Sequence, residues 1–331
     1  MTQDIVMLIA SLVFILLSCI FFTNSVEWFG KKLNLSQGIV GSILAAVGTA
    51  LPETIISIVA IIFYGGREAS QIATGAILGA PFMLSTLGFL VTGLAVAIYS
   101  LLNKRPLTMN ADKKMFYRDL MYFVLIYIIA IFASIFNQFN EIRISAVILV
   151  LLAYAFYIKH IFSDKQQLNE NIGMLYFSKF LKVETNLFWI TAQLSLSLLG
   201  IVFSAHLFVG YVKDLSHIMG ISPLILSIVI APIATELPEK FNSIVWVGQK
   251  KDTLALGNIT GAMVFQSSIP VTIGILFTPW NITGIAFLSA MLALTSAILN
   301  LMWVNMKKSV NPFMLMFGGV LYGIFLITVL S

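Results

Sequence analysis

The chain has 331 residues, of which 59% are hydrophobic and only 10% are charged. Soluble domains carry about 25% charged residues, so this composition excludes a soluble globular protein and indicates an integral membrane protein. The formal net charge of +5 does not predict nucleic-acid binding, because the basic residues gather in loops between apolar segments. The single cysteine, Cys19, cannot form an internal disulfide and indicates no redox compartment.

A helix needs about 20 apolar residues to span a bilayer, and ten segments of the chain meet or exceed that length. They cover residues 4–23, 36–64, 70–102, 116–136, 142–162, 185–211, 221–248, 252–278, 281–305 and 311–330. The only polar linker separates the first five from the last five. The sequence therefore predicts an all-helical membrane protein with a first transmembrane repeat at 1–162, a cytoplasmic linker at 163–184 and a second repeat at 185–331.

The basic residues of the loops predict the orientation of the chain. Loops on one side hold only Arg67, Arg143 and Lys213. The odd-numbered loops hold Lys31, Lys32, Lys104, Arg105, Lys113, Lys114, Lys165, Lys179, Lys182, Lys250, Lys251, Lys307 and Lys308. Because cytoplasmic loops are rich in Lys and Arg, we expect these loops in the cytoplasm and both termini outside, in a multi-pass protein of the cell membrane.

One polar cluster occurs twice, in the second and seventh segments. Gly48-Thr-Ala-Leu-Pro-Glu53 matches Ala234-Thr-Glu-Leu-Pro-Glu239 at an offset of 186 residues. Five helices separate equivalent points of the two copies, and an odd number reverses direction across the membrane, so the copies are predicted to form inverted repeats. Inserting an ionisable group at the centre of a membrane helix costs about 2.5–3.5 kcal/mol of free energy. Proline interrupts the hydrogen bonds of a helix. We expect helix breaks near Gly48–Pro52 and Ala234–Pro238.

These residues resemble the two repeats of the sodium/calcium exchanger family of Ca2+/cation antiporters, which carry a G-T-S-L-P-E pattern in each of two inverted helices. The segments beginning at Gly75 and Gly257 resemble the family's following helices. The resemblance carries over Glu53, Glu239, Thr49 and Thr235. The family's serines are replaced by Ala50, Glu236, Ala80 and Ala262, and its later Asn or Asp by Leu84 and Gln266.

The residues themselves favour a cation site where the two repeats meet. Ca2+ takes six to eight oxygens from carboxylates, carbonyls and water. Broken helices would supply glutamates and freed carbonyls near Ala46 and Pro232. The candidate ligands are Ala46, Thr49, Glu53, Pro232, Thr235, Glu236, Glu239 and Gln266. The alternative is that the glutamates lie at helix ends in water or form structural pairs.

Several neighbours of this site allow two interpretations. Glu236 is an added ligand or proton carrier, or it pairs with Lys240 four residues later, which is the favourable order on a helix. The pairs Gly75/Gly79 and Gly257/Gly261 are motifs for close helix packing, with direct ligation as the alternative. Gln266 and, more weakly, Asn258 either bind the ion or bond across helices.

The predicted function is secondary active antiport, most simply Ca2+ for Na+ by alternating access at a midplane carboxylate site. A proton-coupled exchanger of divalent or monovalent cations is the alternative, followed by an intramembrane enzyme and a passive channel. No zinc motif, nucleophile elbow or phosphate loop supports an enzyme. We expect no cofactor, no nucleic acid and no obligate protein partner; the ligands are Ca2+, Na+ or H+, and the surroundings are the lipid bilayer.

Overall fold

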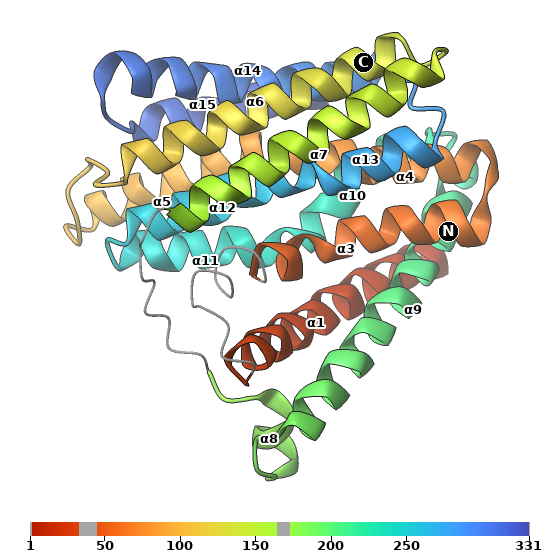
Figure 1. The fold of residues 1–331 in the computed structure, drawn as a ribbon, viewed down its shortest axis with the longest axis horizontal. Coiled ribbons are helices and arrows are strands. Elements are labelled where there is room, and N and C mark those ends of the chain that lie inside the picture. The colour runs from red at the N-terminus through yellow and green to blue at the C-terminus, as the bar shows by residue number, and fades with distance from the viewer. Residues whose placement is uncertain (1, 33–44, 164–172, 331) are drawn as a thin grey trace.

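The computed structural model describes residues 2–32, 45–163 and 173–330, and every regular element within these ranges is helical (Figure 1). The α-helices are α1 Thr2–Lys32, α3 Ala45–Val59, α4 Gly66–Met83, α5 Phe89–Leu101, α6 Lys113–Ile135, α7 Asn140–Ser163, α8 Tyr176–Leu181, α9 Leu187–Met219, α10 Pro223–Thr235, α11 Leu237–Gly248, α12 Asp252–Gln266, α13 Ile269–Phe277, α14 Gly284–Lys307 and α15 Pro312–Leu330. Two π-helical segments are η2 Ala60–Tyr64 and η3 Leu84–Gly88.

Eight described helical segments are long and apolar enough to cross a membrane. Two shorter apolar helices, Leu51–Tyr64 and Pro223–Ile233, fall in the two segments that carry the duplicated cluster. Within the described residues, helices therefore occur in all ten predicted segments. The chain is a multi-pass integral membrane protein.

Local sequence signals set several helix ends. Asp112 precedes α6, and its carboxylate accepts hydrogen bonds from the amides of Lys114 and Met115 at 2.9 and 3.3 Å. Asn186 caps α9 by accepting from the amide of Trp189 at 3.0 Å. Such side chains satisfy amides that have no partner within the first helical turn. Gly220 ends α9 with a φ of 65°, a conformation that glycine adopts without strain.

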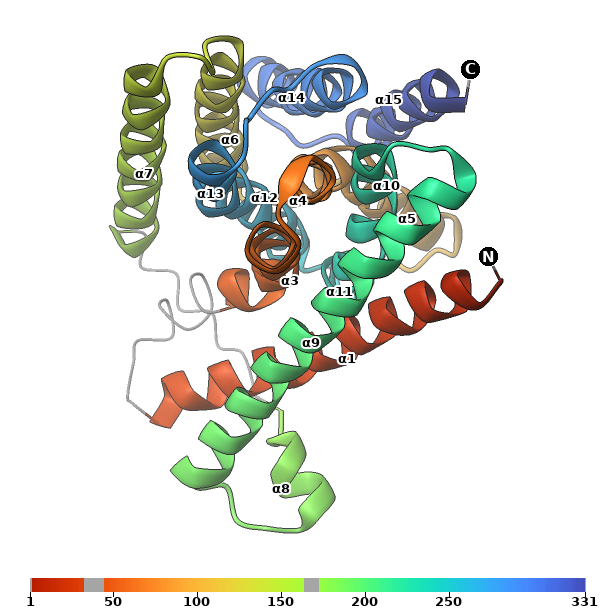
Figure 2. The ribbon, with the colours of Figure 1, turned by 90° about the vertical axis from the view of Figure 1, so that its right-hand side faces the viewer.

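Helices α1 and α9 pack together along one side of the molecule, and α9 runs obliquely at the front of the view in Figure 2. Helices α6, α7, α14 and α15 lie on the opposite side, and α3, α4 and α10 to α13 lie between these groups (Figure 1). The short helix α8, in the predicted linker, packs against α9. The duplicated motif therefore lies in the central layer of the bundle.

The packing is consistent with two related halves. Helix α6 of the first half packs on α12 of the second, and α14 of the second half packs on α4 of the first. In the same way α5 packs on α11, and α13 packs on α3. Each half thus contributes its third helix to the other half's second and fourth helices, as expected for intertwined repeats.

Individual hydrogen bonds repeat as well. Ser57 donates to the carbonyl of Ala73 at 3.3 Å, and Ser243, 186 residues later, donates to the carbonyl of Ala255 at 3.0 Å. In both halves this bond ties the helix carrying the Leu-Pro-Glu motif to the helix that follows.

The third helix of each half is also interrupted at equivalent points. The α-helix changes to η3 at Leu84–Gly88 in the first half, and α12 ends before Ser267 in the second. The hydroxyls of Ser85 and Ser267 donate to carbonyls three residues earlier in both cases.

The two predicted helix breaks have different outcomes. In the second half, α10 ends at Thr235 and α11 begins at Leu237, with Glu236 at the junction, so the break predicted between Ala234 and Pro238 is confirmed. In the first half, α3 is continuous from Ala45 to Val59 with Pro52 inside it. The break expected between Gly48 and Pro52 is therefore not at that position, and residues 33–44 lie outside the described part.

Candidate cation site

Three glutamates from the duplicated motif lie in the interior of the bundle. Glu53 belongs to α3, Glu236 joins α10 to α11, and Glu239 lies in the first turn of α11. Their exposed fractions are 1%, 0% and 0%, so all three are removed from solvent and do not lie at wet helix ends. Burying a carboxylate is costly unless a positive charge or hydrogen-bond donors compensate it.

The two copies of the motif meet directly. Helix α3 packs against α10, and the Thr235 side chain of the second copy lies beside the Glu53 carboxylate of the first. A threonine hydroxyl has one hydrogen, and Thr235 donates it to the carbonyl of Ala231 at 2.8 Å. Both carboxylate oxygens of Glu53 consequently lack a donor among the described residues.

Glu236 and Lys240 form the ion pair that their spacing allows. Lys240 Nζ lies 3.1 Å from Glu236 Oε2, and the side chains are 10% and 0% exposed. The second oxygen, Glu236 Oε1, has no hydrogen-bond partner among the described residues. Glu236 also interacts electrostatically with Glu53 and Glu239, and Lys240 does so with Glu53. Three carboxylates and one ammonium group thus form one electrostatic cluster.

The prolines also affect backbone carbonyls near the predicted positions. The carbonyl of Pro232 accepts a hydrogen bond from the amide of Glu236 at 3.2 Å, which uses one of its two lone pairs. Because proline lacks an amide hydrogen, the carbonyl left without its helical donor is the one four residues earlier. Pro52 and Pro238 therefore release the carbonyls of Gly48 and Ala234, which flank the glutamates.

The packing role predicted for Gly75 and Gly79 is confirmed. A Cβ atom at Gly75 would lie 2.7 Å from the carbonyl oxygen of Leu224, and one at Gly79 would lie 2.7 Å from that of Ile228. Only glycine permits α4 to approach α10 this closely. This close packing holds the first half of the site against the second.

The other small-residue pair has different neighbours. Around Gly257 and Gly261, the described atoms nearest to an added Cβ belong to Met115 and Tyr157. The structure therefore shows direct helix-to-helix backbone contact at the first pair and looser side-chain contact at the second.

The remaining predicted ligands are distributed unevenly around the cluster. Gln266 ends α12 with its side chain 1% exposed, and neither amide atom has a hydrogen-bond partner among the described residues. Asn258 donates from Nδ2 to the main-chain carbonyl of Glu239 at 3.0 Å, which is the predicted bond across helices. Ala46 and Thr49 belong to α3, and their side chains lie outside the described part.

The cluster is not a compact metal cage in this conformation. Among the described residues, no three His, Cys, Asp or Glu side chains lie close enough together to hold one metal ion. Glu53 and Glu236 nevertheless have buried carboxylate oxygens without a hydrogen-bond donor among the described residues, and such groups indicate a bound cation or water. A hard cation at this position would draw the carboxylates inward and complete its shell with released carbonyls.

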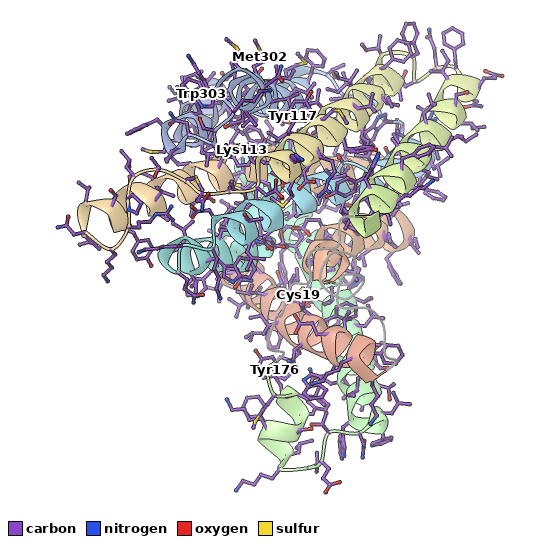
Figure 3. The ribbon with its side chains drawn as sticks, turned by 60° about the vertical axis from the view of Figure 1, so that its left-hand side comes forward. Cys19, Lys113, Tyr117, Tyr176, Met302 and Trp303 are labelled. Carbon is purple, nitrogen blue, oxygen red and sulfur yellow. The ribbon has the colours of Figure 1, made fainter. Side chains whose placement is uncertain are left out.

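Sequence reasoning missed one member of the cluster. Cys19 lies on α1, between Tyr176 and the main bundle in Figure 3, and it interacts electrostatically with both Glu53 and Glu239. Cys19 is buried, with 4% of the residue exposed. Nothing in the apolar sequence around Cys19 indicates that α1 passes the site, because helix order along the chain does not fix which face of α1 points inward.

Comparison with known proteins identifies a family model and individual proteins that are similar to this chain. The family model described as "Sodium/calcium exchanger protein" matches residues 4–162 and 189–331. The putative antiporter CaxA of Alkalimonas amylolytica is 25% identical over 284 residues, which cover 85% of this chain and 83% of CaxA. The sodium/calcium exchanger MaX1 of Methanosarcina acetivorans is 23% identical over 308 residues, covering 85% of each chain.

Solved structures share the fold. The H+/Ca2+ exchanger CAX superposes with a TM-score of 0.74 at 16% identity, over 99% of this chain and 82% of CAX. The sodium-calcium exchanger NCX_Mj superposes with a TM-score of 0.59 at 18% identity, over 98% of both chains. These structures have the inverted-repeat architecture that the duplicated motif predicts. The chain belongs to the sodium/calcium exchanger protein family, a family of transporters and not of enzymes.

Proposed function

We propose that the chain is a secondary active antiporter that exchanges Ca2+ for Na+ by alternating access. The observation that carries this proposal is the meeting of two copies of one motif, each contributing a buried glutamate to the same electrostatic cluster. A pseudosymmetric site between inverted repeats can open to either side of the membrane while its ligands stay the same. Glu53 and Glu239 act as ligands, supported by Thr235, Glu236 and Gln266.

Proton coupling is the second candidate, and a specific observation favours it. Ala80 and Ala262, each 1% exposed, stand where the family pattern has serine, so they offer no hydroxyl oxygen to Na+. Protons, in contrast, can bind to the carboxylates without any hydroxyl ligand. The relatives include both kinds of coupling, since MaX1 is named a sodium/calcium exchanger and CAX an H+/Ca2+ exchanger.

The test is radioactive Ca2+ uptake into proteoliposomes containing only the purified chain, with Na+ and H+ gradients imposed separately. We expect uptake to require one of these gradients and no cofactor or second protein. Uptake that proceeds equally without a counter-ion gradient would indicate a channel and refute antiport.

Variants test the ligands in the same assay. Glu53→Gln and Glu239→Gln remove one negative charge each while keeping side-chain volume, and each should reduce exchange at least about tenfold, since a lost charge-assisted interaction is worth 1.5 kcal/mol or more. Glu141→Gln, at an exposed glutamate in the first turn of α7, is the matched control and should exchange normally. Normal exchange in either site variant would show that the substituted glutamate is not a ligand of the cation.

The orientation is part of the proposal. We infer that the basic loops face the cytoplasm and that both termini lie outside the cell membrane, as the distribution of Lys and Arg predicts. Reporter fusions at the C-terminus that are active only outside the cytoplasm test this, and activity only of a cytoplasmic reporter would reverse the orientation.

A further inference from the structure

We propose that the short helix α8 lies at the membrane surface and binds anionic lipid headgroups. The exposed side chains around this helix form one surface, the α8 face, which consists of Met174, Lys179, Phe180, Leu181 and Lys182. Lipid binding at this face is separate from antiport and does not depend on it.

Two buried amide side chains hold the start of α8 in place. Asn24 of α1 accepts from the amide of Tyr176 at 3.1 Å and donates to the carbonyl of Met174 at 3.3 Å. Gln193 of α9 accepts from the amide of Phe177 at 2.9 Å and donates to Asn24 Oδ1 at 3.1 Å. Asn24 and Gln193 are both buried, so α8 is fastened to α1 and α9 together.

One side of α8 packs on these two helices. Leu175, just before α8, is fully buried. The Tyr176 ring lies 4.9 Å from that of Phe21 in α1, measured between centroids, and the Phe177 ring lies 6.5 Å from that of Trp189 in α9. This packing leaves the α8 face on the outside of the molecule.

The neighbours of α8 place it at the level of the membrane surface. The apolar spans of α1 and α9 are Gln3–Phe29 and Leu187–Met219. Asn24 lies near the end of the first span and Gln193 near the start of the second, and α8 lies beside these two ends, apart from the central helices (Figures 1 and 2). A bilayer crossed by α1 and α9 therefore has its surface next to α8.

The α8 face is apolar although α8 cannot span a bilayer. Met174, Phe180 and Leu181 are 67%, 65% and 53% exposed. The helix has six residues, whereas about 20 are needed to cross the membrane. Clustered apolar side chains on an outer surface indicate contact with a membrane or with another protein. The adjacent bilayer surface supplies the first of these.

Trp28 supports this placement. Its indole N–H donates to the carbonyl of Gly173 at 2.8 Å, and the Lys31 ammonium group lies 4.7 Å from the centroid of its ring. Tryptophan side chains of this kind, with an apolar ring and a polar N–H group, are enriched at membrane–water interfaces.

The charges around the α8 face favour anionic lipids. Lysine side chains at an interface extend their ammonium groups to the headgroups and keep their apolar stems in the hydrocarbon. The acidic residues within 21–32 and 173–187 are Glu27 and Glu184, and the basic residues are Lys31, Lys32, Lys179 and Lys182. This excess of positive charge attracts phosphate groups that carry a net negative charge.

The first experiment measures what surrounds the α8 face. Bimane is attached at position 180 of Cys19→Ala/Phe180→Cys, in vesicles of equal parts phosphatidylcholine and phosphatidylglycerol. We expect brominated lipids to quench this fluorophore and aqueous iodide to quench it only weakly. The control is Cys19→Ala/Ser309→Cys, at an exposed serine in the loop after α14, where iodide should quench strongly. Met174→Cys provides a second labelling position on the α8 face.

The second experiment measures lipid selectivity. Brominated phosphatidylglycerol should quench bimane at position 180 at lower mole fraction than brominated phosphatidylcholine. One lysine near an anionic surface favours anionic lipid roughly fivefold, so Lys179→Gln/Lys182→Gln should lower this preference at least about fivefold. Lys307→Gln/Lys308→Gln is the matched control, because each pair includes a left-handed lysine at a helix C-cap, and it should change nothing.

Three results would overturn the proposal. Iodide quenching at position 180 as strong as at position 309 would place the α8 face in water. Protection from both iodide and brominated lipids would show that protein, such as a second copy of the chain, covers it. Equal quenching by the two brominated lipids, or an unchanged preference in Lys179→Gln/Lys182→Gln, would exclude selective binding of anionic headgroups.

Discussion

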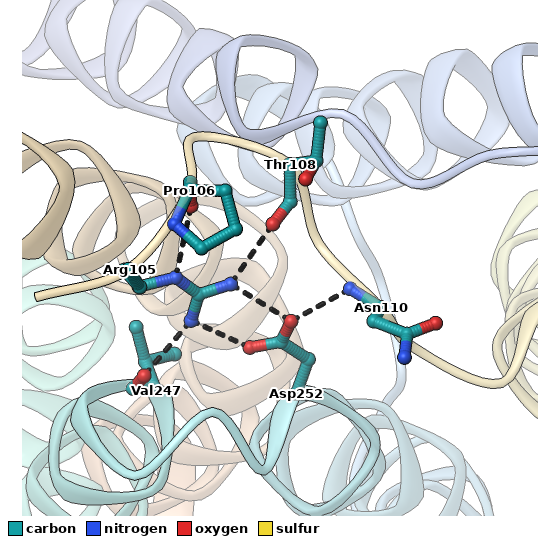
Figure 4. Close-up of polar contacts among 6 residues, drawn as sticks. All are labelled: Arg105, Pro106, Thr108, Asn110, Val247 and Asp252. Carbon is teal, nitrogen blue, oxygen red and sulfur yellow. Dashed lines mark hydrogen bonds and ion pairs between the residues drawn. The ribbon is translucent and has the colours of Figure 1, made fainter.

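A buried ion pair outside the cation site allows a quantitative test of the fold. Arg105, in the loop after α5, donates to both carboxylate oxygens of Asp252, the first residue of α12, at 2.7 and 2.8 Å (Figure 4). The side chains are 2% and 1% exposed. Arg105 also donates to the carbonyls of Val247 and Thr108, and Asp252 accepts from the amide of Asn110. The pair therefore fastens the loop to the corner between α11 and α12.

The change Arg105→Met keeps the apolar part of the side chain and leaves Asp252 buried with a single remaining donor in this network. Breaking a buried pair by removing one partner costs about 3–5 kcal/mol, because the other charge stays desolvated. Removing both charges in Arg105→Met/Asp252→Leu should cost clearly less than the sum of the single changes. The expected coupling between the two sites is about 2–3 kcal/mol.

The measurement is unfolding of the purified protein in mixed detergent micelles, followed by tryptophan fluorescence, for the two single variants and the double variant. Arg67→Met, at an exposed arginine, is the matched control and should change stability by less than about 0.5 kcal/mol. Additive losses in the double variant would show that the two side chains do not stabilise one another and would refute this reasoning.

Three further predictions concern the site. Glu236→Gln leaves Lys240 without its charged partner, so Ca2+ exchange should fall at least about tenfold in vesicle uptake; unchanged uptake would show that Glu236 does not belong to the site. Gly79→Ala places a Cβ 2.7 Å from the carbonyl oxygen of Ile228 and should cost about 1–3 kcal/mol in unfolding assays, whereas Gly323→Ala, with no atom within 4 Å of the new Cβ, should not. Lower pH protonates carboxylates and removes the charge that binds Ca2+, so Ca2+ binding measured by calorimetry should weaken from neutral to mildly acidic pH; flat affinity would exclude protonatable ligands.

The sequence predicted the helices well because the bilayer imposes a simple length rule. Apolar runs of sufficient length reappear as helices in the described part of the chain. The Glu236–Lys240 pair was also foreseeable, since i and i+4 positions share a helix face. These features depend on local spacing, which a sequence displays directly.

Features that depend on tertiary packing were not foreseeable. Arg105 and Asp252 are 147 residues apart, and no periodicity links them. Pro52 is accommodated inside α3 while the equivalent Pro238 follows a break, although the local sequences are alike. The two copies differ in the residue before the leucine, which is Ala50 in the first and Glu236 in the second.

Labelling of Cys19 can be used to follow the conformation of the transporter. The chain has no other cysteine, so a thiol-directed reagent can react at one place only, and that place is within electrostatic range of Glu53 and Glu239. A small water-soluble maleimide reaches the thiol only when an aqueous path connects it to one side of the membrane. The rate of labelling from each side, with and without Ca2+, therefore measures which way the unmodified wild-type transporter is open, with no engineered label.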